Sequence, residues 1–214
     1  MTKAVLFDLD GTILNTTLDL NDAVNYALLV NNFNEITLEE TIKYTGNGIK
    51  KLMERAIPGG KDNVLFPKAF NDFKEYYNIH CLDKTTAYPE MAHTLSILKE
   101  RGYLLAVVSN KADFLTKKIV AHYYPNTFDY VIGARENMNL KPAADLPQFV
   151  LQELKVEKEN AFYIGDTDVD FETAVNTGLK PIIVTYGFRS KAFLIKKGIT
   201  VFSNSPIGLL DYLK

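Results

Sequence analysis

Short apolar segments alternate with helical patterns over most of the chain. Six runs are apolar on both faces, which is typical of buried parallel strands rather than half-exposed hairpins. These runs cover residues 3–7, 103–109, 129–133, 160–165, 181–186 and 200–202. Apolar residues at helical spacing predict helices over 90–101, 114–124, 146–154 and 168–177. The alternation of strand and helix predicts a doubly wound α/β fold with a Rossmann-like parallel sheet.

Residues 17–84 break this alternation because they offer helical patterns and no convincing strand. Apolar side chains recur at helical spacing near 20–28, 37–46, 48–57 and 66–77. Thr37 and Glu40 have the spacing of a capping box, which predicts the start of the second helix. We therefore expect a small helical domain over 17–84, inserted into a core domain made of residues 1–16 and 85–214.

Composition narrows the class of protein. The chain has 214 residues, of which 47% are hydrophobic and 23% charged, as in ordinary globular domains. A net charge of −2 without basic runs argues against nucleic-acid binding. No run approaches the roughly 18 apolar residues of a membrane span, and no signal-type segment opens the sequence, so we expect a cytoplasmic protein, monomeric or homodimeric. The single cysteine, Cys81, excludes an internal disulfide and is expected to pack in a helix.

Two acids, Asp8 and Asp10, follow the first predicted strand and precede a glycine and a threonine. A lone pair of this kind often caps a helix or turn. In a parallel α/β sheet, however, functional groups gather at the carboxyl ends of strands. One carboxylate can act there as a nucleophile toward phosphorus, and the other can protonate the leaving oxygen and later activate water. This chemistry requires positive charge and N–H donors from other strand ends.

Candidate phosphate-binding groups follow two later strands. Ser109 and Asn110 come after the second predicted strand, where a hydroxyl group and backbone N–H groups at a helix start can hold phosphate oxygens. A plain helix N-cap explains them equally well. Lys141 precedes Pro142, whose ring restricts the backbone so that the ammonium group is presented at a fixed place. Taken alone, a Lys-Pro pair is more often a solvated turn.

A third strand end carries the acids Asp166, Asp168 and Asp170. Carboxylate oxygens are hard ligands, and Mg²⁺ usually takes one or two of them together with substrate phosphate. The dipole of the following helix also favours acids in its first turn, which accounts for Asp168. Asp166 is expected before the helix begins, so a metal-binding role fits it better.

These motifs together resemble those of the haloacid dehalogenase superfamily phosphatases, and more narrowly the phosphoglycolate phosphatase group, over essentially the full length. The resemblance rests on Asp8-Leu9-Asp10-Gly11-Thr12, Ser109-Asn110-Lys111, Lys141-Pro142, and Gly165-Asp166-Thr167 with Asp170. The helical insert is similar to the family's small α-helical cap. Tyr44-Thr45-Gly46-Asn47-Gly48 and Val184-Thr185-Tyr186-Gly187 resemble further stretches of the narrower group. Asn15-Thr16 and Ala143-Ala144-Asp145 depart from its common pattern.

The resemblance implies a role for each matched residue. Asp8 would be the nucleophile and Asp10 the general acid and base. Mg²⁺ would be held by the Asp8 carboxylate, the Asp10 backbone carbonyl and Asp166, with Asp170 supporting the site. The transferring phosphoryl group would be bound by Ser109 and Lys141, and by Asn110 through its backbone.

Substrate choice is expected to lie with the cap. Asn47, Lys50 and Arg55 are candidates for contacting the leaving group, and one of the basic residues can pair with a substrate carboxylate such as that of phosphoglycolate. A solvated helix face is the simpler explanation of the two cations. The predicted function is a Mg²⁺-dependent phosphomonoester hydrolase acting on a small metabolite, first of all 2-phosphoglycolate.

Other functions share parts of this pattern. One is a phosphomutase of the β-phosphoglucomutase type, and another is a phosphatase of broad specificity toward sugar phosphates, nucleotides or pyrophosphate. An inactive phosphate-binding module is a third, which the presence of Asp8, Asp10, Lys141 and Asp166 together disfavours. A dehalogenase has less need of Asp10.

Overall fold

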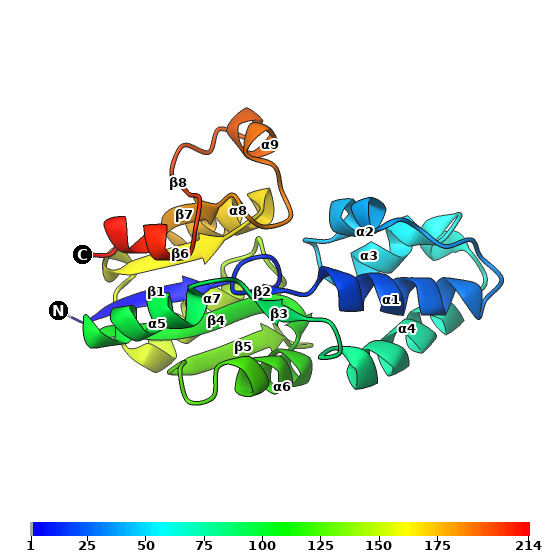
Figure 1. Ribbon diagram of the computed structural model, residues 1–214, viewed down its shortest axis with the longest axis horizontal. Helices are drawn as coiled ribbons and strands as arrows, with labels where there is room; N and C mark the ends of the chain where they lie inside the picture. The colour runs from blue at the N-terminus through cyan, green and yellow to red at the C-terminus, as the bar shows by residue number, and fades with distance from the viewer. Residues whose placement is uncertain (1) are drawn as a thin grey trace. The chain divides into compact units, whose positions relative to one another are not determined.

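The computed structural model describes residues 2–214 (Figure 1). Within this range the larger sheet has six strands in the spatial order β5-β4-β1-β6-β7-β8. Their bounds are Lys3–Phe7 for β1, Tyr103–Ala112 for β4, Tyr130–Ala134 for β5, Ala161–Gly165 for β6, Lys180–Val184 for β7 and Phe202–Ser203 for β8. All neighbouring pairs of described strands in this sheet run parallel, which confirms the predicted α/β fold.

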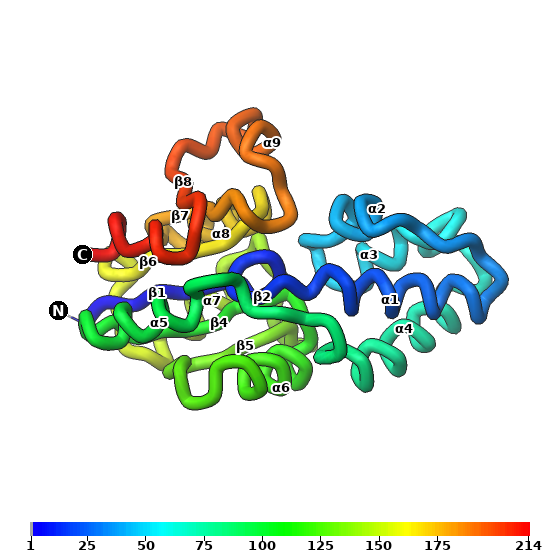
Figure 2. Tube along the Cα trace, viewed as in Figure 1, coloured from blue at the N-terminus to red at the C-terminus, as the bar shows by residue number. Residues whose placement is uncertain are grey.

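The first strand lies inside the sheet. Figure 2 shows β1 between β4 and β6, which come much later in the chain. The carboxyl end of β1 is therefore flanked by the carboxyl ends of two other strands, because parallel strands end at the same edge of the sheet. This topology brings distant sequence motifs to one place.

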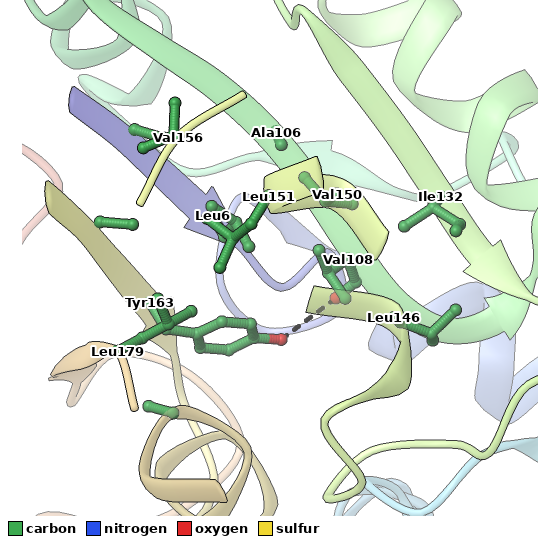
Figure 3. Close-up of a cluster of buried hydrophobic side chains, with 13 residues drawn as sticks. Leu6, Ala106, Val108, Ile132, Leu146, Val150, Leu151, Val156, Tyr163 and Leu179 are labelled. Atoms are coloured by element: carbon green, nitrogen blue, oxygen red, sulfur yellow. Dashed lines mark hydrogen bonds between the residues drawn. The ribbon is translucent and has the colours of Figure 1, made fainter. Parts of the chain in front are cut away.

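Helices connect and cover the strands. They are α5 (Met91–Glu100), α6 (Asp113–Tyr123), α7 (Asp145–Leu154), α8 (Asp168–Thr177) and the short α9 (Lys191–Lys196), with 3-10 turns at Lys158–Asn160 and Ile207–Asp211. On one face of the sheet, Leu6 and Val108 pack with Leu146 and Val150 of α7 in a closed apolar cluster (Figure 3). Side chains alternate along a strand, so the buried Val5 points to the opposite face.

Residues Asn15–Thr86 form a second compact unit, and the other described residues form the first. The second unit contains α1 (Thr17–Leu29), α2 (Leu38–Tyr44), α3 (Ile49–Ala56), a 3-10 turn at Gly60–Asp62 and α4 (Phe66–His80). Two short strands, β2 (Leu14–Asn15) and β3 (Thr86–Ala87), pair where the chain passes from one unit to the other. The inserted domain was predicted over 17–84. Its role as a cap stays a prediction.

Two local features of the second unit follow from its sequence. The capping box is present as predicted, since the Thr37 N–H donates to Glu40 Oε2 (2.8 Å) and the Glu40 N–H donates to Thr37 Oγ1 (3.2 Å). Cys81 is buried but lies directly after α4 rather than inside a helix.

No helix among the described residues is long and apolar enough to span a membrane.

Candidate active site

The central contact of the site joins Asp8 to Lys141. Asp8 directly follows β1, and its N–H donates to the Ile164 carbonyl oxygen of β6 (2.8 Å), which extends the sheet pairing by one residue. Lys141 Nζ lies 2.7 Å from Asp8 Oδ1 and 2.8 Å from Asp170 Oδ1, with only 2% of the lysine side chain exposed. A buried ammonium group is costly unless paired, so the two carboxylates hold it in place.

Burial sets the protonation behaviour of this pair. It raises the pKa of Asp8 to about 7, with repulsion from Asp170 and Asp10 adding to the effect and Lys141 opposing it. Burial opposes the charged form of Lys141, but the carboxylates of Asp170 and Asp8 outweigh it and hold the pKa of Lys141 well above its usual value. Lys141 is therefore a permanent cation in the site.

The aromatic ring of Tyr163 packs beside the Lys141 ammonium group. Lys141 Nζ lies 5.6 Å from the centre of the Tyr163 ring, within the range of a cation–π contact. The Tyr163 hydroxyl group donates to the Val108 carbonyl oxygen (3.2 Å), as Figure 3 shows. Tyr163 was not predicted as part of the site, because a tyrosine within an apolar strand gives no sign of what its ring faces.

Asp166, at the end of β6, is completely buried and held by two donors. The Thr12 hydroxyl group donates to Asp166 Oδ1 (3.2 Å), and the Phe188 N–H donates to Oδ2 (2.6 Å). Burial, together with repulsion from Asp170 and Asp8, raises the pKa of Asp166 well above its usual value. The position predicted from the sequence, at a strand tip before the helix, is confirmed.

Two glycines make room for Asp166. A Cβ on Gly11, whose φ is +84°, would lie 2.3 Å from Asp166 Oδ2. A Cβ on Gly187 would lie 2.3 Å from Asp166 Cβ. The glycine after the two N-terminal acids and the glycine after β7 are therefore both required by close packing around one carboxyl group.

Asp170 has two functions in the structure. Its Oδ2 accepts hydrogen bonds from the Asp166 N–H (3.2 Å), the Thr167 N–H (3.0 Å) and the Thr167 hydroxyl group (2.7 Å), forming the capping box of α8. Its Oδ1 pairs with Lys141 (2.8 Å). Asp168, in contrast, pairs with Lys197 (3.1 Å), outside this group of contacts.

The donor set fits a hard divalent cation. Among the described residues, carboxylate oxygens of Asp8, Asp166 and Asp170 lie within 4.8 Å of one another, and all three residues are buried. With Asp10 the site holds four carboxyl groups against the ammonium groups of Lys141 and Lys111, so negative charge is in excess when all are ionised. Burial is the main cause of the raised pKa values of Asp8 and Asp166, and repulsion between these carboxylates adds to it. A cation held by these oxygen ligands would compensate the excess negative charge.

Asp10 has a cationic partner that the sequence analysis did not assign. Lys111 Nζ lies 2.8 Å from Asp10 Oδ1, and the exposed fractions of the two side chains are 2% and 16%. The available signal was a charged residue directly after Ser109-Asn110 at the end of an apolar segment. Buried lysines are almost always paired, so a carboxylate partner at a neighbouring strand end was to be expected.

The structure corrects the local setting of Ser109 and Asn110. Strand β4 continues to Ala112 and α6 begins at Asp113, so neither residue stands at a helix start. The Asn110 side chain holds the backbone of Lys141: Asn110 Nδ2 donates to the Lys141 carbonyl oxygen (3.0 Å), and the Lys141 N–H donates to Asn110 Oδ1 (2.8 Å). Ser109 Oγ accepts the Lys111 N–H (3.2 Å).

The predicted specificity residues all lie in the second unit. The Arg55 guanidinium donates to Asn47 Oδ1 (2.9 Å) and to the Tyr44 carbonyl oxygen. Of the predicted specificity residues, Arg55 and Asn47 are therefore in direct contact at the loop between α2 and α3. Lys50 is exposed in the first turn of α3.

Comparisons with known proteins identify the family of the chain. The family model described as haloacid dehalogenase-like hydrolase matches residues 5–184. The chain is 32% identical over 191 residues to a phosphoglycolate phosphatase of Aquifex aeolicus, covering 87% of the chain and 86% of that protein. It is 28% identical to a phosphoglycolate phosphatase of Pseudomonas putida, covering 99% of the chain and 77% of that protein.

A solved structure gives the same result for the fold. A candidate phosphoglycolate phosphatase from Lactobacillus delbrueckii subsp. bulgaricus superimposes with a TM-score of 0.95 and 32% sequence identity. The alignment covers 100% of this chain and 99% of that one.

Proposed function

The chain belongs to the haloacid dehalogenase-like hydrolases and is a phosphatase of that family, and on this premise we propose that it hydrolyses small phosphomonoesters through a phosphorylated Asp8. The observation that carries the proposal is a pair of aspartate–lysine contacts directly beyond β1, Asp8 with Lys141 and Asp10 with Lys111, in which only 2% of each lysine side chain is exposed. A nucleophile and a proton donor each have a fixed cation beside them.

The first step transfers the phosphoryl group to the protein. An Asp8 carboxylate oxygen attacks phosphorus, a new P–O bond forms, and the bond from phosphorus to the leaving oxygen breaks. Asp10 gives its proton to that leaving oxygen, so the product departs as an alcohol. Lys141 stays charged beside Asp8 and compensates negative charge on the phosphoryl oxygens.

The second step returns Asp8 to its starting state. Asp10, now a carboxylate, takes a proton from water while the water oxygen attacks phosphorus. The bond between phosphorus and Asp8 breaks, and inorganic phosphate leaves. Ser109 and the backbone of Asn110 are proposed to bind the phosphoryl oxygens during both steps. The Asn110 side chain meanwhile fixes the Lys141 backbone.

Mg²⁺ is the proposed cofactor. The Asp8 carboxylate, the Asp10 backbone carbonyl and Asp166 would hold it, with Asp170 behind them. When bound, the ion supplies positive charge that lets anionic carboxylates and an anionic phosphate share one site. Thr12 and Phe188 orient Asp166 for this purpose.

We propose 2-phosphoglycolate as the first substrate to examine, with a small soluble phosphate ester as the general class. Two relatives that match most of this chain are named phosphoglycolate phosphatase, which supports this choice. Phosphoglycolate carries a carboxylate besides its phosphate, and the basic residues Lys50 and Arg55 of the second unit are candidates for pairing with it.

The test is phosphate release from a panel of esters, with Mg²⁺ and with a chelator. The panel contains 2-phosphoglycolate, sugar phosphates, nucleoside monophosphates and pyrophosphate. We expect release that the chelator abolishes and that is fastest with 2-phosphoglycolate. Comparable release from many esters would contradict the proposed specificity, and no release from any would contradict the hydrolase.

The matched control is Asp8→Asn, which keeps the size of the side chain and removes the nucleophile. We expect turnover to disappear, because an amide does not form the phosphorylated intermediate. Thermal unfolding should stay within a few degrees of the wild type, since Lys141 keeps its contact with Asp170. A variant that still turns over would overturn the assignment of Asp8.

A further inference from the structure

Lys111 is held both at its backbone and at its ammonium group. Its N–H donates to Ser109 Oγ (3.2 Å), and its carbonyl oxygen accepts a hydrogen bond from the Thr116 hydroxyl group (3.2 Å). A Cβ on Gly133 in the neighbouring strand would lie 2.3 Å from that carbonyl oxygen, so the two backbones are in close contact. The pairing of β4 with β5 is irregular between Val108 and Ala112, the segment that contains Lys111. The backbone here departs from regular pairing, and the side chain points to Asp10.

The contact between Lys111 and Asp10 differs from a surface ion pair. Only 2% of the lysine side chain is exposed, and its ammonium nitrogen lies 2.8 Å from Asp10 Oδ1. Exposed pairs such as Lys117 with Asp113, where half of the lysine is accessible, contribute little because water screens them. A buried ammonium group restricts its carboxylate partner much more strongly, because water does not screen the attraction between the two charges.

The two lysines of the site divide their contacts. Lys141 contacts Asp8 and Asp170, whereas Lys111 contacts Asp10. Each of the two carboxyl groups with a proposed chemical role therefore has a buried lysine beside it, Lys111 from the last residues of β4 and Lys141 from the segment between β5 and α7. Removal of Lys111 is therefore expected to affect the proton transfers by Asp10 more than the phosphoryl transfer to Asp8.

We propose that Lys111 is a positioning residue for proton transfer: its ammonium group fixes the Asp10 carboxyl group so that Asp10 can protonate the leaving oxygen. This inference rests on the proposed function and deepens it. A proton transfer requires the donor within hydrogen-bond distance of the acceptor, so a carboxyl group that rotates loses much of its effect. Lys111 acts through Asp10 and is not expected to touch the reacting atoms.

The leaving group provides the test. An alkoxide needs a proton to depart, whereas 4-nitrophenolate is a stable anion and departs without one. The experiment compares kcat/KM for the best alkyl ester of the panel with kcat/KM for 4-nitrophenyl phosphate, in the wild type and in Lys111→Met. We expect the alkyl ester to lose roughly 10²-fold, within the range of general-acid catalysis, and the nitrophenyl ester much less.

Three further variants make the result specific. Asp10→Asn should show the same selective loss, because it removes the acid itself. Lys111→Arg, which keeps a cation, should recover part of the alkyl-ester activity. Lys117→Met removes an exposed lysine near the start of α6 and should leave both rates unchanged. Where Lys111→Met lowers the unfolding temperature too far for assay, Lys111→Gln is measured in its place.

The outcomes separate this inference from the proposed function. Equal losses on both esters, or no loss on either, would overturn the positioning role while the wild type remains a phosphatase. A wild type inactive on every ester would instead overturn the proposed function. A combined Lys111→Met, Asp10→Asn variant no slower on the alkyl ester than Asp10→Asn alone would support action through Asp10. A further large loss would contradict it.

Discussion

At the scale of the residue, Gly11 shows how closely the site is packed. Its backbone has a φ of +84°, and a Cβ there would lie 2.3 Å from an oxygen of the Asp166 carboxyl group. Such a distance requires either the backbone or Asp166 to move. Gly102 has a nearly equal φ of +80°, yet nothing lies within 4 Å of the position of its Cβ. Substitution of Gly102 therefore tests backbone strain alone, whereas substitution of Gly11 tests backbone strain together with displacement of Asp166.

We predict that Gly102→Ala lowers stability by roughly 1–2 kcal/mol, because an L side chain disfavours the left-handed backbone, and that Gly11→Ala lowers it further, because its Cβ also displaces Asp166. Only Gly11→Ala should also reduce phosphatase activity, since it displaces Asp166. Thermal unfolding and phosphate release measured on both variants test this. If the two lose activity equally, the contact with Asp166 has no functional importance.

The residues of the site differ in how well the sequence predicts them. Asp8, Asp10, Lys141 and Asp166 were predicted because strand ends in a parallel sheet share one edge. In the structure Asp8 contacts Lys141 and lies near Asp166, whereas Asp10 contacts Lys111. The two hydrogen bonds between the Asn110 side chain and the Lys141 backbone were not predicted. They join residues 31 positions apart through one amide side chain, and neither residue type nor spacing identifies such a contact.

At the scale of the element, the helix α8 connects local structure to the site. Thr167 is its N-cap, and Asp170 completes the capping box with the same carboxyl group that pairs with Lys141. A feature that belongs to ordinary helix initiation thus also fixes the active-site cation. Thr37 begins α2 with a capping box of the same design, but far in sequence from any proposed catalytic residue.

We predict that Thr167→Ala and Thr37→Ala each cost about 1 kcal/mol of stability, the usual effect of losing an N-cap. Thr167→Ala should in addition lower kcat/KM by roughly tenfold or more, because the Asp170 carboxyl group loses a 2.7 Å hydrogen bond and Lys141 is held less firmly. Thr37→Ala should leave kcat/KM unchanged. Equal kinetic effects in the two variants would show that α8 capping has no special link to Lys141.

Elements with strong periodicity were predicted well, and their ends less so. The strand predicted over 103–109 continues to Ala112, because Ser109, Asn110 and Lys111 are all buried and remain extended despite being polar. The polar residues at the end of this strand indicated a helix start. In the structure they are polar because Asn110 contacts the Lys141 backbone and Lys111 contacts Asp10. The short α9 was not predicted, since six residues with one buried side chain give no clear pattern.

At the scale of the whole molecule, the active site concentrates charge that the chain as a whole does not show. The net charge is only −2, yet Asp8, Asp10, Asp166 and Asp170 gather around Lys111 and Lys141. Composition alone gave no sign of this, because charges spread along the sequence are brought together only by the sheet topology. The stability of the folded chain should therefore respond to pH and to divalent cations through this one cluster.

The sign of the pH response follows from the raised pKa of Asp8, about 7 in the folded chain against 3.8 ordinarily. Between these values the folded chain binds more protons than the unfolded chain, so the free energy of unfolding falls as pH rises. The pKa of Asp166 is raised as well, which acts in the same direction. In a chelator, we predict that the unfolding temperature decreases between pH 5 and pH 8.

Mg²⁺ should reverse this decrease if it occupies the proposed site, because a ligand of the ionised carboxylates in the folded chain stabilises that chain over the unfolded one. We predict a rise in unfolding temperature with Mg²⁺ that is larger at pH 8 than at pH 5. Asp166→Asn should abolish most of the rise, whereas Asp168→Asn, which removes a nearby acid paired with Lys197, should keep it. Calorimetry of the three proteins tests this without any assay of turnover. An Mg²⁺ response that survives in Asp166→Asn would place the cation elsewhere, and a response equal at both pH values would separate cation binding from the ionisation of Asp8.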